Sequence, residues 1–100
     1  MFVHAVYFWL KPNLSEADQK QFWAGVRSLG EIKSVKHCFI GTPAATDRPI
    51  IDRSYSCALT VVFEGDGEQE AYQVDPIHDA FRIECAHLWD RVLIYDSVTQ

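Results

Sequence analysis

Imidazole and thiol groups are the side chains in this sequence best suited to acid–base or nucleophilic chemistry, and the chain has four histidines and three cysteines. Cys38, Cys57 and Cys85 lack the Cys-x-x-Cys spacing of a zinc site or a redox pair, so we expect three small buried hydrophobic residues. A thiolate nucleophile at Cys57 would need an adjacent base or cation, and His4 is the one candidate. We therefore do not predict a catalytic cysteine.

Carboxylates could bind a metal ion at two other places. Glu84 and His87 are spaced i, i+3 on an expected helix, and the turn from Glu64 to Glu68 carries three carboxylates. A single helical pair is a weak metal signature, and the turn lacks the complete calcium-loop pattern. The sequence also has no glycine-rich phosphate loop. We therefore predict neither a metal site nor a cofactor.

Composition excludes several classes of partner. Nine basic against fourteen acidic residues give a formal net charge of −5, which disfavours binding to nucleic-acid phosphates or to an anionic membrane surface. No apolar run approaches the roughly 20 residues that span a bilayer. The first residues lack the basic region and the small-residue cleavage site of a signal peptide, so we expect a protein of the reducing cytoplasm.

Alternation and capping signals predict one domain over residues 1–100. Residues 2–10 are rich in aromatic and β-branched side chains and predict a strand. Ser15 is a good N-cap and Gly30 a plausible C-cap for the amphipathic helix between them. Asp75 and Pro76 suit the N-cap and first turn of the last helix. The other expected elements are strands at 35–42, 55–64 and 91–98, a turn at 65–67 and a short helix at 68–74.

This order, β-α-β-β-α-β, predicts a ferredoxin-like α+β fold, in which a four-stranded antiparallel sheet carries both long helices on one face. Both alternating sets of side chains in residues 2–10 are mostly apolar, although a sheet covered on one side should alternate apolar with polar residues. A second copy is the economical cover for the other face. We therefore expect a homodimer packed sheet against sheet, a dimeric α/β barrel, through Val3, Ala5, Tyr7 and Trp9.

Three segments together resemble a known family. They are VHAVYFWLKP at 3–12, SYSCALTVVFE at 54–64, and AYQVDPIHDAF at 71–81, which is followed by an apolar strand. In this combination the chain is similar to the stress-responsive A/B barrel, or Dabb, family over almost its whole length. The most specific part of the match is Tyr72-x-x-x-Pro76-x-His78-x-x-Phe81.

The resemblance implies a dimeric α+β barrel, in a family whose functions are scattered and often unassigned. One member, olivetolic acid cyclase, closes a linear polyketide by an aldol reaction with a His/Tyr pair, and the matching positions here are His78 and Tyr72. His4 matches a pocket histidine on the first strand, whereas Cys57 stands where that enzyme has a further histidine. The resemblance thus implies a pocket bordered by His4, Cys57, Tyr72 and His78.

Three hypotheses for the function remain open. The first is a protein that binds a small apolar or aromatic molecule between sheet and helices. The second is a cofactor-free lyase or cyclase in which His78 is a general base next to a carbonyl and Tyr72 is its partner. The third is a structural dimer module, in which His78 braces the helix junction and Tyr72 packs with a satisfied hydroxyl.

Overall fold

Seven helices and strands and two short 3-10 turns make up most of the chain in the computed structural model, which describes residues 1–100. In chain order they are β1 (Phe2–Leu10), α1 (Glu16–Ser28), a 3-10 turn (Leu29–Glu31), β2 (His37–Gly41), β3 (Cys57–Phe63), α2 (Asp66–Gln73), α3 (Pro76–Cys85), a second 3-10 turn (Ala86–Leu88) and β4 (Trp89–Val98). None of the helices is long and apolar enough to cross a membrane.

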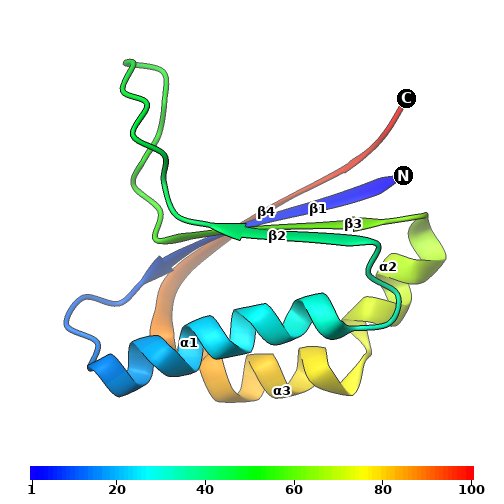
Figure 1. Ribbon diagram of the computed structural model, residues 1–100, viewed down its shortest axis with the longest axis horizontal. Coiled ribbons are helices and arrows are strands. Elements are labelled where there is room, and N and C mark those ends of the chain that lie inside the picture. Colours follow the sequence, from blue (N-terminus) through cyan, green and yellow to red (C-terminus); the bar gives the residue numbers. More distant parts are fainter.

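The strands form one antiparallel sheet in the order β2-β3-β1-β4. Helices α1 and α3 lie side by side against one face of this sheet, and α2 leads from the end of β3 into α3 (Figure 1). The predicted ferredoxin-like α+β fold is therefore confirmed. Three strands begin at other residues than expected. Strand β2 begins at His37, β3 at Cys57 and β4 at Trp89.

Strand β1 divides its side chains between the two faces of the sheet. His4, Val6 and Phe8 are buried on the face that the helices cover. They share this face with the other members of the core, among them Phe22 and Val26 of α1, Leu59, Val61 and Phe63 of β3, and Phe81 and Cys85 of α3. The alternation of β1 thus places an imidazole, His4, in the layer between sheet and helices.

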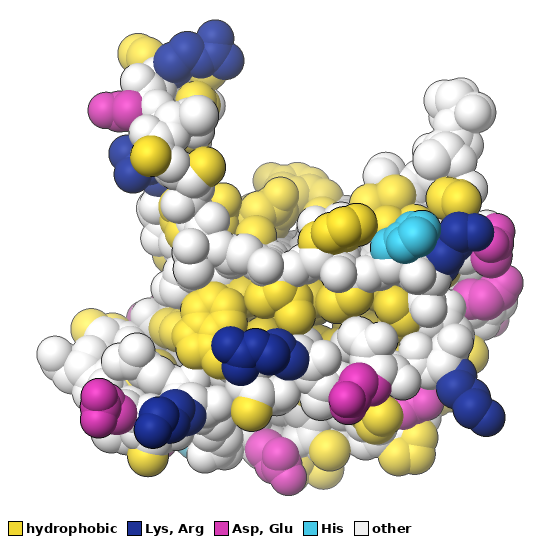
Figure 2. Space-filling view, in the orientation of Figure 1, with side chains coloured by type: hydrophobic (Ala, Val, Ile, Leu, Met, Phe, Trp, Pro, Cys, Tyr) yellow, Lys and Arg dark blue, Asp and Glu magenta, His cyan; other side chains and the backbone are white.

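The opposite face of the sheet has no helix over it (Figure 1). Val3, Ala5, Tyr7 and Trp9 lie on this face and are half-buried, as is expected from their alternation with His4, Val6 and Phe8. The further side chains of this open face include Phe39 of β2 and Tyr95 of β4, which are 62% and 61% exposed. Hydrophobic side chains gather on this side of the sheet in the space-filling view (Figure 2).

The N-termini of both long helices follow the predicted caps. The Ser15 hydroxyl accepts a hydrogen bond from the backbone N–H of Asp18 at 3.0 Å. The Asp75 carboxylate accepts one from the N–H of Ile77 at 2.8 Å, with Pro76 in the first turn of α3. Each cap satisfies an N–H that has no partner within its helix, so these two starts are determined locally.

Two helix boundaries differ from the sequence-based expectation. Gly30 does not act as the C-cap of α1, because α1 ends at Ser28 and the chain continues into a 3-10 turn without a positive φ at any glycine. Instead, Gly30 gives Cys38 room, since a Cβ at this position would lie 3.3 Å from the Cys38 side chain. Helix α2 begins at Asp66, inside the expected turn, with Gly65 before its first residue.

An arm between β2 and β3, residues 42–56, stands out from the sheet on the side away from the helices (Figure 1). Its base is attached to the open face, because Trp9 Nε1 donates a hydrogen bond to the Ser54 hydroxyl at 3.1 Å. Farther out, the side chain of Ile50 is 82% exposed. The arm therefore carries an apolar side chain that nothing in the same chain covers.

Candidate functional site

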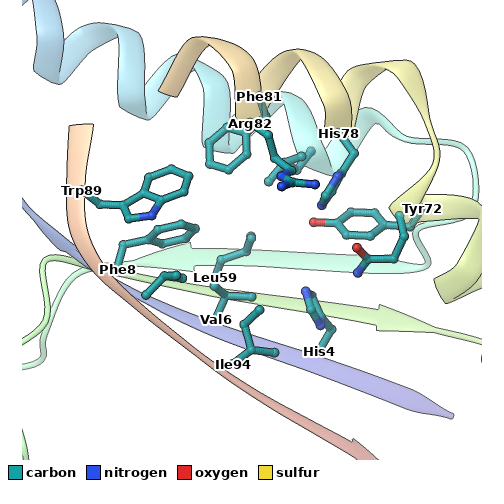
Figure 3. A pocket seen from close by; sticks show the side chains of 13 residues that line it. His4, Val6, Phe8, Leu59, Tyr72, His78, Phe81, Arg82, Trp89 and Ile94 are labelled. Atoms are coloured by element: carbon teal, nitrogen blue, oxygen red, sulfur yellow. The ribbon is translucent and has the colours of Figure 1, made fainter. Parts of the chain in front are cut away.

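A cavity of about 250 Å³ lies between the covered face of the sheet and helix α3 (Figure 3). Its walls are mainly apolar and include Val6, Phe8, Leu59, Phe81, Trp89 and Ile94. The polar side chains that line it are His4, Tyr72, Gln73, His78 and Arg82. Cavities with this combination of apolar walls and a few convergent polar groups are typical of small-molecule sites.

His4 is held by a carboxylate from the neighbouring strand. The register of β1 and β4 sets His4 opposite Asp96, and His4 Nδ1 lies 2.5 Å from Asp96 Oδ1. The imidazole is buried, whereas the Asp96 side chain is 43% exposed. Because an ionised carboxylate only accepts hydrogen bonds, Nδ1 carries the proton of this contact and Nε2 is the nitrogen left for other partners.

Tyr72 lies between the two histidines of the cavity. Its ring centroid is 5.0 Å from that of His78 and 5.8 Å from that of His4, and both pairs meet edge to face. The hydroxyl points into the cavity beside His78 (Figure 3). Burial raises the pKa of this phenol well above its ordinary value, with a smaller contribution from Cys38. Tyr72 is therefore a hydrogen-bond donor at neutral pH and not a base.

His78 is positioned by the first turn of α3, directly after the Asp75 cap and Pro76. Burial, and secondly the nearby Arg82 cation, lower the pKa of His78 below its ordinary value. The imidazole is therefore neutral at pH 7, the form that can accept a proton. Its Nδ1 is buried and has no hydrogen-bond partner. A buried polar atom without a partner is unusual in folded proteins.

Cys57 does not belong to this cavity, which corrects the four-residue border expected from the sequence. It does face the helices, but it lies opposite Phe8, whereas His4 lies opposite Val61. Phe8 itself reaches the cavity, whereas Cys57 is not among the residues that line it. The thiol is completely buried in the core, and burial raises its pKa to about 12. Cys57 is thus a core residue without thiolate character at neutral pH.

Asp96 and Arg82 are the two charged side chains that sequence reasoning missed. Asp96 could have been found by setting the first and last strands antiparallel, because it then falls opposite His4. Arg82 could have been found from its position one helical turn after His78, since residues spaced i, i+4 share a helix face. In both cases the signal is a pairing with a histidine, not a sequence motif.

The other two histidines and the two possible metal sites lie away from the cavity. His37 and His87 are exposed on the surface, and His37 stacks on Phe39. The Glu64 carboxylate of the acidic turn forms an ion pair with Lys36. The structure has no group of three or more His, Cys, Asp or Glu side chains that could hold a metal ion. Neither Glu84 and His87 nor the Glu64–Glu68 turn therefore forms such a group.

The fold and the cavity together define an α+β protein of the ferredoxin-like class with a pocket between sheet and helices. The chain belongs to the stress-responsive A/B barrel domain (Dabb) family, which matches residues 2–99. No curated protein matches it by sequence.

Several solved structures share this fold. A Dabb family protein from Mesorhizobium loti has a TM-score of 0.78 at 24% identity, over 99% of this chain and 96% of its own. The hydroxynitrile lyase from Passiflora edulis has a TM-score of 0.80 at 19% identity, over 99% and 93%. A dimeric ferredoxin-like protein of unknown function from Thermobifida fusca has a TM-score of 0.77 at 18% identity, over 98% and 90%. At these identities the likeness concerns the fold alone.

Proposed function

We propose that this protein binds a small apolar or aromatic molecule in the cavity between its sheet and its helices. The observation that carries the proposal is a mainly apolar cavity on which the His78 imidazole and the Tyr72 hydroxyl converge. A volume of about 250 Å³ exceeds the roughly 150 Å³ that accommodates benzene and falls below the sites of drug-sized ligands, about 300 Å³ and more. The ligand is therefore the size of one substituted ring.

Calorimetric titration with p-cresol tests this proposal. Ile94 lines the cavity and is half-exposed, so Ile94→Trp should fill the space while the chain still folds. Ile83→Trp is the matched control, because Ile83 is 81% exposed and does not line the cavity. We expect binding to the native chain and the Ile83 variant, and none to the Ile94 variant. Equal binding to all three would place the ligand elsewhere, and the proposal would fall.

A second candidate is a cofactor-free lyase or cyclase, which the pairing of a neutral imidazole with a protonated phenol favours. In such a reaction His78 takes the proton from a carbon next to a carbonyl, and the electron pair moves onto the carbonyl oxygen. The Tyr72 hydroxyl donates a hydrogen bond to that enolate oxygen, and the enolate carbon then attacks a second carbonyl. The oxygen of that second carbonyl takes the proton back from His78, which returns to its neutral form. A hydroxynitrile lyase is among the proteins that share this fold.

Deuterium exchange into phenylacetone in D₂O measures the first step alone. We expect the native chain to accelerate exchange next to the carbonyl, His78→Gln to abolish the acceleration, and Tyr72→Phe to lower it by about 10²-fold. His87→Gln is the control, because His87 is exposed outside the cavity. Exchange no faster than in buffer would exclude the catalytic candidate, and the binding proposal would stand on its own titration.

We further propose that a second copy of the chain covers the open face of the sheet, through Val3, Ala5, Tyr7 and Trp9. Exposed aromatic side chains on this face and the protruding arm support a sheet-to-sheet homodimer, in which the arm lies along the partner and Ile50 is covered. The related protein from Thermobifida fusca is described as dimeric. A chain that dimerises and binds no ligand would match the third hypothesis, a structural module.

Three free cysteines fit a reducing compartment such as the cytoplasm.

A further inference from the structure

Arg82 brings a positive charge to the edge of an apolar cavity. It lies on α3 one turn after His78, and its guanidinium group is directed toward the cavity beside that imidazole (Figure 3). The structure has two ion pairs, His4 with Asp96 and Lys36 with Glu64, so no carboxylate of the chain pairs with Arg82. A guanidinium group at a cavity wall with all its donors uncommitted is suited to an acceptor that the chain does not supply.

Among the other polar groups at this end of the cavity, Tyr72 is a second donor. Tyr72 presents a hydroxyl that remains protonated, and no carboxylate is among the residues that line the cavity. Burial and Arg82 lower the pKa of His78, and the carboxylates of Asp79 and Asp75 oppose them in part. Arg82 is the second cause of the lowered pKa of His78, after burial, so its cation lies close to that imidazole. The Arg82 guanidinium and the Tyr72 hydroxyl thus offer two donor groups to the space beside His78, and an anionic group there would be stabilised.

We propose that the ligand of this cavity is a one-ring carboxylate, whose anionic group binds Arg82 and Tyr72 while its ring lies against the apolar walls. This inference rests on the proposed binding function and names its ligand class. A carboxylate suits the site better than a phosphate dianion, because its single negative charge is matched by Arg82, the one Lys or Arg that lines the cavity. A phosphate dianion would retain an uncompensated charge in a chain whose net charge is already −5.

Two probes of nearly equal shape distinguish the contribution of the anionic group to the affinity from the contribution of the ring. Phenylacetate carries the carboxylate, and phenylacetamide replaces it with a neutral amide. Both are titrated calorimetrically into the native chain, Arg82→Gln, Arg82→Lys and Arg27→Gln. Arg27 is an exposed arginine in the last turn of α1 that does not line the cavity, and its variant controls for the general loss of one positive charge.

For the native chain and the Arg27 variant we expect phenylacetate to bind about ten-fold more tightly than phenylacetamide. Arg82→Gln should remove that preference and leave the affinity for phenylacetamide within two-fold of the native value. Arg82→Lys should restore part of the preference, because it retains the charge and loses the two-pronged geometry.

Two other outcomes are distinguishable. Equal affinity of the native chain for both probes, or an equal loss of both in Arg82→Gln, would overturn the carboxylate inference and leave the proposed binding function intact. Binding of neither probe, together with no binding of p-cresol, would overturn both. Circular dichroism of each variant shows whether it folds, and Arg82→Lys, with its similar length and charge, provides a second test if Arg82→Gln does not.

Discussion

His4 and Asp96 are 92 residues apart in the sequence and lie opposite each other on neighbouring strands, with His4 Nδ1 2.5 Å from Asp96 Oδ1. The carboxylate determines which nitrogen of the imidazole carries the proton, and thereby which one is left toward the cavity. The pair also gives a buried polar ring a partner that its apolar surroundings do not.

Asp96→Ala tests this pairing. It leaves the buried His4 without its partner, so we expect the free energy of unfolding to fall by about 1–3 kcal/mol in urea denaturation. We also expect ¹⁵N NMR to show that the Nδ1–H form of His4 is no longer dominant. Asp90→Ala, at an exposed position of the same strand, controls for the loss of a carboxylate from β4 and should change neither. An equal effect of both variants would contradict the pairing.

His78 predicts a dependence of stability on pH. Burial and Arg82 hold its pKa in the folded chain below the ordinary value of about 6.5 that applies to the unfolded chain. Between these two pKa values the unfolded chain binds more protons, so the free energy of unfolding decreases as the pH falls below about 6.5. His78→Gln should lack this part of the decrease, and the exposed His87→Gln should keep it. Chemical denaturation at pH 5 to 8 measures the free energy of unfolding of the native chain and of both variants. The same dependence on pH in all three proteins would refute the role of His78.

Close packing of α1 on α3 depends on Gly25. A Cβ at this position would lie 2.7 Å from Cys85 Sγ and 3.0 Å from Cδ1 of Phe81. Gly25→Ala should therefore lower the free energy of unfolding by about 1–3 kcal/mol, in spite of the higher helix propensity of alanine.

Gly67→Ala is the matched control for this packing. It adds the same methyl group in the first turn of α2, where nothing lies within 4 Å. We expect it to be neutral or to stabilise the chain by up to about 1 kcal/mol. A stabilising Gly25→Ala, or equal effects of the two variants in chemical denaturation, would show that the two helices have room between them.

Ala5→Arg tests the proposed dimer. Ala5 lies in the middle strand β1 on the open face, opposite Thr60 and Tyr95 of the two neighbouring strands. A charge placed there can be solvated in a monomer but not between two sheets, so we expect sedimentation to show a dimer for the native chain and a monomer for Ala5→Arg. Ala24→Arg, exposed on α1, should remain dimeric. A native monomer at micromolar concentration would contradict the sheet-to-sheet arrangement.

Much of the fold could be predicted because its signals are local. Ser15 and Asp75 are each bonded to an N–H two or three residues away, and the two faces of β1 follow from alternation within nine residues. The excess of apolar sheet surface over what two helices can cover is also visible in the sequence. Gly30 was the misleading signal, because its role comes from Cys38 and not from its own backbone.

The site required tertiary structure. Alternation correctly assigned Cys57 to the helix-covered face, but only strand pairing decided how far along that face it lies, opposite Phe8 and away from His4. The same pairing brought Asp96 to His4 from the far end of the chain, and the packing of α3 directed Arg82 to the cavity. The sequence by itself thus determined the order of the elements and the two faces of the first strand, and its resemblance to the family pointed to His4, Tyr72 and His78. The strand register and the helix packing depend on contacts between distant residues. They decided that Asp96 lies beside His4 and that Arg82 lies beside His78.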